Sequence, residues 1–192
     1  MKWRSWLEKQ AWTTLFIDGN HDNHRLLRAL PEANMFGGIV GYASNNILHL
    51  RRGEVYLLNG HTFFTFGGAM STDRMARTEG VDWWPEEIAS EQEMQHGLKK
   101  LRDVACKVDY ILTHTAPKRI ILAYFENYIR AMDPTAEFLD FVEDTTEFKS
   151  WYFAHFHRDG FYEGQFIFCY NRMHILDNLL LPEACTKKEG KY

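Results

Sequence analysis

The chain has 192 residues, of which 45% are hydrophobic and 15% aromatic, and its formal net charge is −4. These values are typical of a packed globular protein, and no Pro/Gly/Ser-rich linker divides the chain, so we interpret residues 1–192 as a single domain with a polar tail at about 186–192. The negative charge argues against a protein that binds a nucleic-acid backbone, so a bound phosphate would need a local cation. Three scattered cysteines, no signal-peptide pattern and no apolar run of membrane-spanning length predict a cytoplasmic protein without a membrane partner.

The first part of the chain predicts a strand that ends at an unusual polar motif. Helical spacing of apolar residues predicts a helix over 2–10, and the β-branched run at 13–17 predicts a strand that leads into "IDGNHDN". After this motif we expect a helix over 23–33, capped by Asp22 or Asn23. The strands expected next are 39–43, 46–50, 54–58 and 61–66. The dipeptide Asn59-Gly60 between the last two predicts the turn of an antiparallel hairpin.

The rest of the chain alternates between loops, helices and buried strands. A glycine-rich loop, "FGGAMSTDR", precedes the remaining elements. We expect helices over 90–105, 119–130 and 135–144, and strands over 108–113, 149–154, 160–170 and 173–177. Strand–helix units mixed with hairpins predict an α/β sandwich of mixed sheets with helices on the outside.

Three polar clusters follow predicted strands, where ligands collect in α/β folds. They are the segment Gly19–Asp22, the single residue His114, and the pair His155 and His157. Taken singly, these clusters also fit a plain turn, a helix cap and ordinary loop residues. Because the two histidines of the pair are two residues apart, extended backbone would direct both imidazoles to the same side, as binding of neighbouring metal ions requires.

The order of these pieces resembles the calcineurin-like metallophosphoesterases, in particular their bacterial and phage-type members. The resemblance rests on "GNHD", "KVDYILTHTAP", "FTFGGAMSTDR…WWPEE" and "AHFH", and it covers nearly the whole chain. It implies a calcineurin-like sandwich of mixed β-sheets flanked by helices. It also implies a metal-dependent phosphoesterase that hydrolyses phosphomonoester or phosphodiester bonds, with the physiological substrate left open.

The resemblance also implies a role for each residue of the three clusters. Metal ligands are expected at Asn20, His114 and His155 for one ion and at His157 for another, and catalytic roles at His21 and Asp22. His21 would donate to the phosphate and leaving group, and Asp22 would hold the imidazole in place. Imidazole and amide ligands favour a divalent transition metal such as Mn, Fe, Zn or Ni.

One departure from the family pattern concerns its two earlier motifs, D-x-H and G-D-x-x-D. Neither occurs among the 18 residues before Gly19, so we interpret the chain as N-terminally truncated, or its start as lying upstream of Met1. Two dications about 3.5 Å apart repel by roughly 19 kcal/mol at an effective dielectric of 20, and the carboxylates that offset this in the family are missing. We therefore expect at most one metal per chain and weak activity. The alternative is a catalytically inactive family member that binds a metal or a partner.

The remaining signals are weaker. Asp73, Arg74 and Arg77 follow the glycine-rich loop and are candidate phosphate contacts, although charged loop residues are more often solvated. We expect His24 at the surface and structural roles for a further set of histidines, which comprises His49, His61, His96 and His174. Loss of the family's first strand–helix–strand unit would expose sheet edge and apolar surface, so we expect a homo-oligomer.

Overall fold

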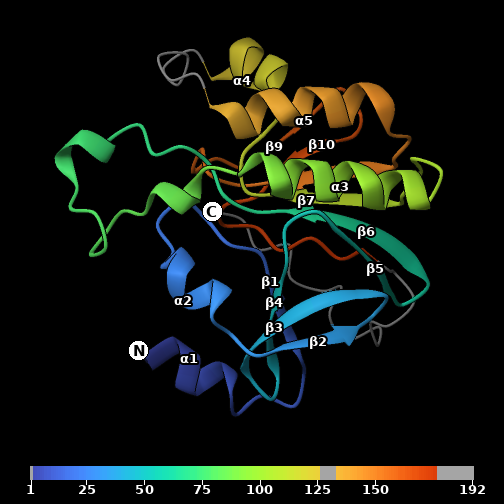
Figure 1. The fold of residues 1–192 in the computed structure, drawn as a ribbon. Coiled ribbons are helices and arrows are strands. Elements are labelled where there is room, and N and C mark those ends of the chain that lie inside the picture. Colours follow the sequence, from blue (N-terminus) through green and yellow to red (C-terminus); the bar gives the residue numbers. More distant parts are fainter. Residues whose placement is uncertain (1, 126–132, 177–192) are drawn as a thin grey trace, which may run out of the picture.

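The computed structural model describes residues 2–125 and 133–176, which form an α/β structure of two mixed sheets flanked by helices (Figure 1). The four-stranded sheet has the order β1 (Thr14–Phe16), β4 (Ile47–Leu50), β3 (Gly38–Ser44), β2 (Glu32–Met35). The six-stranded sheet has the order β5 (Glu54–Leu58), β6 (His61–Phe66), β7 (Tyr110–Thr113), β8 (Ser150–Phe153), β10 (Phe166–Phe168), β9 (Gly160–Tyr162). The helices are α1 (Lys2–Leu7), α2 (His24–Arg28), α3 (Glu91–Asp103), α4 (Lys118–Tyr124) and α5 (Pro134–Thr145), with short 3-10 helices η1 (Arg74–Ala76) and η2 (Pro85–Glu87).

Most predicted elements are confirmed within the described ranges. Asn59 and Gly60 both have positive φ angles and turn the antiparallel β5–β6 hairpin. A capping box formed by Ser90 and Glu93 starts α3, and Asn23 caps α2 through the backbone amide of Leu26. These elements follow from local sequence signals alone.

Three predicted elements are wrong. The single strand expected over 160–170 is an antiparallel hairpin of β9 and β10, because the chain turns at Glu163 and Gly164, which both have positive φ angles. The helix expected over 23–33 ends at Arg28, because Pro31 cannot continue it, and the residues from Glu32 onward instead pair with β3. The strand expected over 173–177 is absent from the described part of that range, 173–176. The expected polar tail at 186–192 and the predicted helical residues 126–130 lie outside the described residues.

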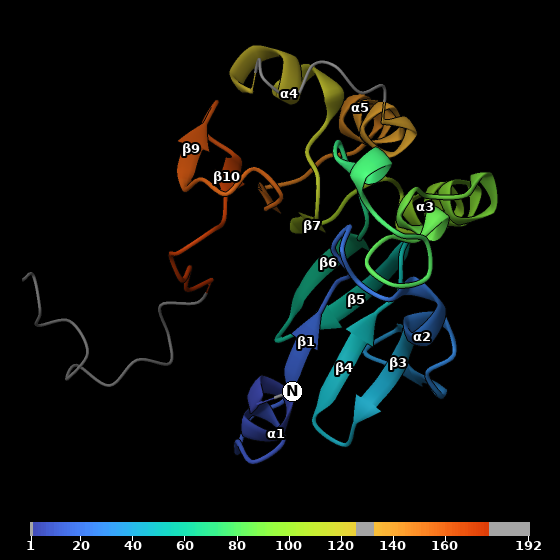
Figure 2. The same cartoon turned by 90° about the vertical axis from the view of Figure 1, so that its left-hand side faces the viewer.

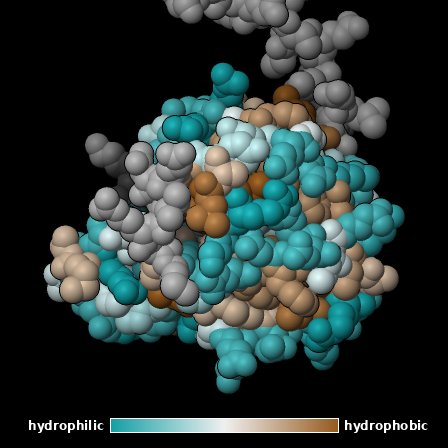
Figure 3. All heavy atoms as spheres, turned by 90° about the horizontal axis from the view of Figure 1, so that it is seen from above, coloured by the Kyte–Doolittle hydropathy of each residue, from teal (hydrophilic) through white to brown (hydrophobic). Residues whose placement is uncertain are grey.

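The main hydrophobic core lies between the six-stranded sheet and helices α3, α4 and α5, which cover one face of that sheet (Figures 1 and 2). Leu101, Ile120 and Leu139 from these helices pack with aromatic side chains of the sheet, including Trp151 and Phe166. Viewed from the side of the helices, the described surface is mostly hydrophilic with hydrophobic residues between (Figure 3). The helices therefore bury one face and present a mainly polar one to solvent.

A smaller core joins the two sheets where β3 and β4 meet β5. Val40, Leu48 and Leu50 pack there against Tyr56 of β5. The hydroxyl of Tyr56 donates a hydrogen bond to the carbonyl oxygen of Ile39 and so ties one sheet to the other. This contact links β3 of the four-stranded sheet to β5 of the six-stranded sheet.

Candidate metal and phosphate site

The predicted site residues lie at the carboxyl ends of strands from both sheets. β6, β7 and β8 are neighbouring parallel strands in register, with Phe66 opposite Thr113 and Thr113 opposite Phe153. His114 therefore follows β7 beside the residues that follow β8. The segment after β1 is held at the same edge by a hydrogen bond from the Gly68 amide to the Asp18 carbonyl oxygen, 2.9 Å long. This arrangement brings together residues that are far apart in the sequence.

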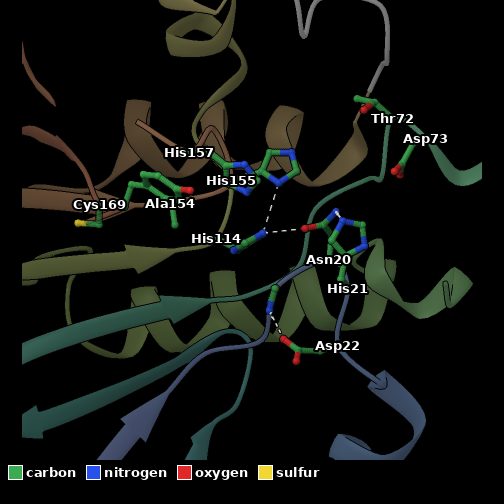
Figure 4. A pocket seen from close by; sticks show the side chains of 12 residues that line it. Asn20, His21, Asp22, Thr72, Asp73, His114, Ala154, His155, His157 and Cys169 are labelled. Carbon is green, nitrogen blue, oxygen red and sulfur yellow. Dashed lines mark hydrogen bonds between the residues drawn. The ribbon is translucent and has the colours of Figure 1, made fainter. Parts of the chain in front are cut away.

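Three of the predicted metal ligands converge on one point (Figure 4). His114 Nε2 lies 2.9 Å from Asn20 Oδ1 and 3.3 Å from His155 Nδ1. Ligand atoms bound at about 2.1 Å from one metal ion are about 3.0 to 3.4 Å from one another in octahedral or tetrahedral geometry. Both distances from His114 Nε2 therefore lie in the range expected for atoms that share one transition-metal ion.

The two histidines of the "AHFH" segment do not lie in extended backbone, and this part of the prediction is wrong. β8 ends at Phe153, and His155 and His157 adopt positive φ angles of 66° and 50°. Positive φ angles are uncommon for residues other than glycine, although histidine is among the residues that adopt them more often. His155 faces His114, whereas His157 stacks on Tyr170 with ring centroids 5.2 Å apart.

Burial keeps the two clustered imidazoles neutral. Burial, together with the nearby His155, lowers the pKa of His114 from 6.5 to about 3. Burial, together with His157 and His21, lowers the pKa of His155 to about 4. Both rings are therefore unprotonated at neutral pH, as metal ligands must be.

The predicted catalytic pair is close to this cluster, but the two side chains have different partners. His21 is exposed, and its Nε2 atom lies 3.3 Å from Asn20 Nδ2 and 3.4 Å from a guanidinium nitrogen of Arg77. Asp22 Oδ2 instead accepts a hydrogen bond of 2.6 Å from the Gly19 amide (Figure 4). In this conformation Asp22 closes the turn of the motif, and the proposed hold of Asp22 on His21 stays a prediction.

The three candidate phosphate contacts are placed at different distances from the cluster. Asp73 lines an open pocket of about 510 Å³ together with Asn20, His21, His114 and His155. Arg77 reaches His21 but is also paired with Asp73 at 2.6 Å. Arg74 is exposed, and its guanidinium contacts the sulfur of Met70. The structure therefore brings Asp73 and Arg77 to the site and leaves Arg74 without a contact to the cluster residues.

A buried charge network lies directly below the motif, and sequence reasoning missed it. Asp18 is 2% exposed and accepts hydrogen bonds from Arg52 at 2.6 Å and from His49 at 3.0 Å. His24, expected at the surface, is buried, with Nδ1 3.5 Å from Asp18. Burial alone would raise the pKa of Asp18, but Arg52, His24 and His49 together hold it well below its usual range.

Ser71 and Glu87 were also not predicted, and both are buried beside Asn20.

The other histidines interpreted as structural lie away from the cluster. His49 belongs to the buried network, His96 pairs with Glu54, His61 lies near Asp109, and His174 packs on Tyr152.

The donor set fits one metal ion better than two. Asn20, His114 and His155 would supply three neutral ligands, and Mn, Fe, Zn and Ni accept such oxygen and nitrogen donors. Among residues 2–125 and 133–176, no group of three or more His, Cys, Asp or Glu residues is placed to hold a metal. The candidate set differs from such a group because one of its ligands is an asparagine. None of the described helices combines the length and hydrophobicity that crossing a bilayer requires.

Comparison of the chain with models of known protein families gives no match, and comparison with curated proteins gives none either.

Proposed function

We propose that this chain is a metal-dependent phosphoesterase of the calcineurin-like type, acting on phosphomonoester or phosphodiester bonds. The observation that carries the proposal is the convergence of Asn20 Oδ1, His114 Nε2 and His155 Nδ1 from the ends of three different strands. No local turn or cap requires these three residue types to meet. A divalent metal held there would act as a Lewis acid on a phosphoryl oxygen and activate a water for attack.

The chain's own residues would orient the substrate and handle the leaving group. His21 is exposed at the pocket, so its ring can reach a phosphate oxygen and would donate a ring N–H to it, and in the structure its Nε2 atom faces two donor groups, those of Asn20 and Arg77. Arg77 lies 3.4 Å from the same nitrogen and adds positive charge on this side of the pocket. Asn20, His114 and His155 would hold the metal, with His157 nearby on the same loop as His155.

The test is hydrolysis of p-nitrophenyl phosphate and bis(p-nitrophenyl) phosphate by protein first stripped with a chelator and then loaded with Mn²⁺, Ni²⁺ or Zn²⁺. We expect slow turnover that requires the added metal. His21→Ala should lower turnover by about 100-fold or more, the usual worth of a general acid, while metal content is retained. His61→Ala, at the opposite end of β6, is the matched control and should leave turnover unchanged.

Two negative results have different meanings. If folded, metal-loaded protein turns over neither substrate, the chain is a metal-binding protein without this activity. If folded protein takes up no metal at all, the proposed site is wrong.

A further inference from the structure

Glu87 is a fully buried carboxylate whose two oxygens both accept hydrogen bonds from Ser71. It ends the 3-10 helix η2 and is 0% exposed. Its Oε1 atom accepts a hydrogen bond from the Ser71 amide, and its Oε2 atom accepts one from the Ser71 hydroxyl, each 2.6 Å long. A carboxylate is costly to bury, so a position that keeps one there with defined partners needs an explanation.

The hydroxyl of Ser71 then determines how the neighbouring amide is oriented. Because the Ser71 hydrogen is donated to Glu87, the Ser71 oxygen can only accept a hydrogen bond from its other neighbour. That neighbour is Asn20 Nδ2, at 2.9 Å. The amide group of Asn20 must therefore direct its NH₂ toward Ser71 and its oxygen toward His114.

We propose that Glu87 and Ser71 are positioning residues that hold the Asn20 amide so that its oxygen, and not its nitrogen, faces the metal. This inference rests on the proposed function, because it assigns a role toward the same metal site. The relay runs from Glu87 through Ser71 to Asn20 entirely within buried side chains. The hydrogen bond from Asn20 Nδ2 to Ser71 also makes Oδ1 a stronger electron-pair donor to a cation.

The isosteric variant Glu87→Gln tests the relay because it reverses the direction of the hydrogen bonds. The Ser71 amide can only donate, so the glutamine oxygen must take the place of Oε1, and the glutamine NH₂ then faces the Ser71 oxygen. If the Asn20 amide stayed as it is, the buried Ser71 hydrogen would lose its acceptor, so we expect that hydrogen to turn toward Asn20 and the Asn20 amide to flip, which directs its NH₂ at the metal position. An NH₂ group is not a metal ligand.

The measurement is the affinity for Mn²⁺ by equilibrium dialysis, together with the visible absorption spectrum of bound Co²⁺, on the full chain. For Glu87→Gln we expect a 10- to 100-fold loss of affinity and a changed Co²⁺ spectrum, as is typical when a supporting hydrogen bond to a ligand is removed. Glu86→Gln is the matched control. Glu86 precedes Glu87 on η2 and pairs with Arg25 at the surface. The Mn²⁺ affinity and the Co²⁺ spectrum of the Glu86→Gln variant should therefore equal those of the unmodified chain.

A rescue variant distinguishes loss of the Asn20 orientation from nonspecific disruption of the fold. It also tests the inference if the single variant does not fold. In Asn20→Asp combined with Glu87→Gln, one oxygen of residue 20 accepts from Ser71 and the other faces the metal, and the number of carboxylates is unchanged. We expect this double variant to bind Mn²⁺ at least as tightly as the unmodified chain. Affinity within twofold of normal in Glu87→Gln, or no recovery in the double variant, would overturn the inference while leaving the metal site standing. If the unmodified chain binds no metal, the proposed function fails as well.

Discussion

Asp18 shows how a single buried side chain holds the loop that carries the candidate ligand Asn20. Its carboxylate accepts hydrogen bonds from Arg52 and His49, and its backbone oxygen accepts from the Gly68 amide. A side chain at Gly68, whose φ angle is +80°, would collide with the Glu87 carbonyl oxygen and with Arg52. The loop after β1 and the loop after β6 are thus locked together by contacts that tolerate little change.

At this scale we predict that Arg52→Ala destabilises the protein by about 3 to 5 kcal/mol, because it leaves the buried Asp18 charge without its main partner. Arg28→Ala is the control. Arg28, like Arg52, pairs with Glu93, but the Arg28 side chain is 48% exposed. We therefore expect its removal to change the free energy of unfolding by about 1 kcal/mol or less. Urea unfolding followed by tryptophan fluorescence measures both. A loss of about 1 kcal/mol or less in Arg52→Ala as well would show that the Asp18 network contributes little stability.

The sequence identifies the residues that face the pocket better than the residues that support them. The proximity of Asn20, His114 and His155 could be predicted because each follows a strand, and loops at the carboxyl ends of strands gather around ligand sites in α/β folds. Ser71 and Glu87 could not, because serine in a loop and glutamate near a proline have the composition of ordinary surface segments. Their burial depends on how two loops pack, which no local pattern encodes. The positive φ angles of His155 and His157 could not be predicted either, because the spacing of two residues in the sequence does not show whether the backbone is extended.

Among the elements, three parallel strands set the position of the site. Asp109 joins the beginnings of all three, because it accepts hydrogen bonds from the Thr62 amide and hydroxyl and pairs with Lys149 at 2.6 Å. Local signals predicted each of these strands. The parallel pairing of β1 with β4 was not foreseen, because it depends on contacts between segments separated by a hairpin.

The Lys149 ammonium and the Thr62 hydrogen bonds lower the pKa of Asp109 from 3.8 to about 2. A carboxylate with a lowered pKa stabilises the fold fully above its unfolded pKa, and this stability is lost as the pH falls from about 4 to about 2. We expect Asp109→Asn to destabilise the protein at pH 7 by about 1 kcal/mol or less, because the pair is partly exposed. The difference should shrink below pH 4 when unfolding is followed by circular dichroism. A difference that stays constant down to pH 2.5 would assign it to packing.

In the molecule as a whole, an apolar pocket of about 340 Å³ lies between β1 and the six-stranded sheet. Its lining includes Leu15, Leu58, Leu112 and Tyr152 and contains no charged side chain. β1 is also an edge strand of its sheet among the described strands, as Figure 2 shows. Exposed sheet edge and apolar surface of this kind were the basis for expecting self-association.

We therefore predict that the chain forms a homodimer or larger oligomer in solution. Pairing of two copies would cover apolar surface and an unpaired strand edge at the same time. Multi-angle light scattering coupled to size exclusion, over a hundredfold range of protein concentration, measures the mass directly. A mass of 22.7 kDa at every concentration would contradict the prediction.

The metal content of the chain tests the account most directly. The three converging ligands Asn20, His114 and His155 are neutral, so they fit one ion, whereas two dications about 3.5 Å apart would repel by roughly 19 kcal/mol at an effective dielectric of 20. After dialysis against buffered Mn²⁺ or Zn²⁺, elemental analysis should find at most one metal ion per chain, and the combined variant His114→Ala and His155→Ala should lose it. Two tightly bound ions per chain, or binding unchanged in that variant, would contradict the account.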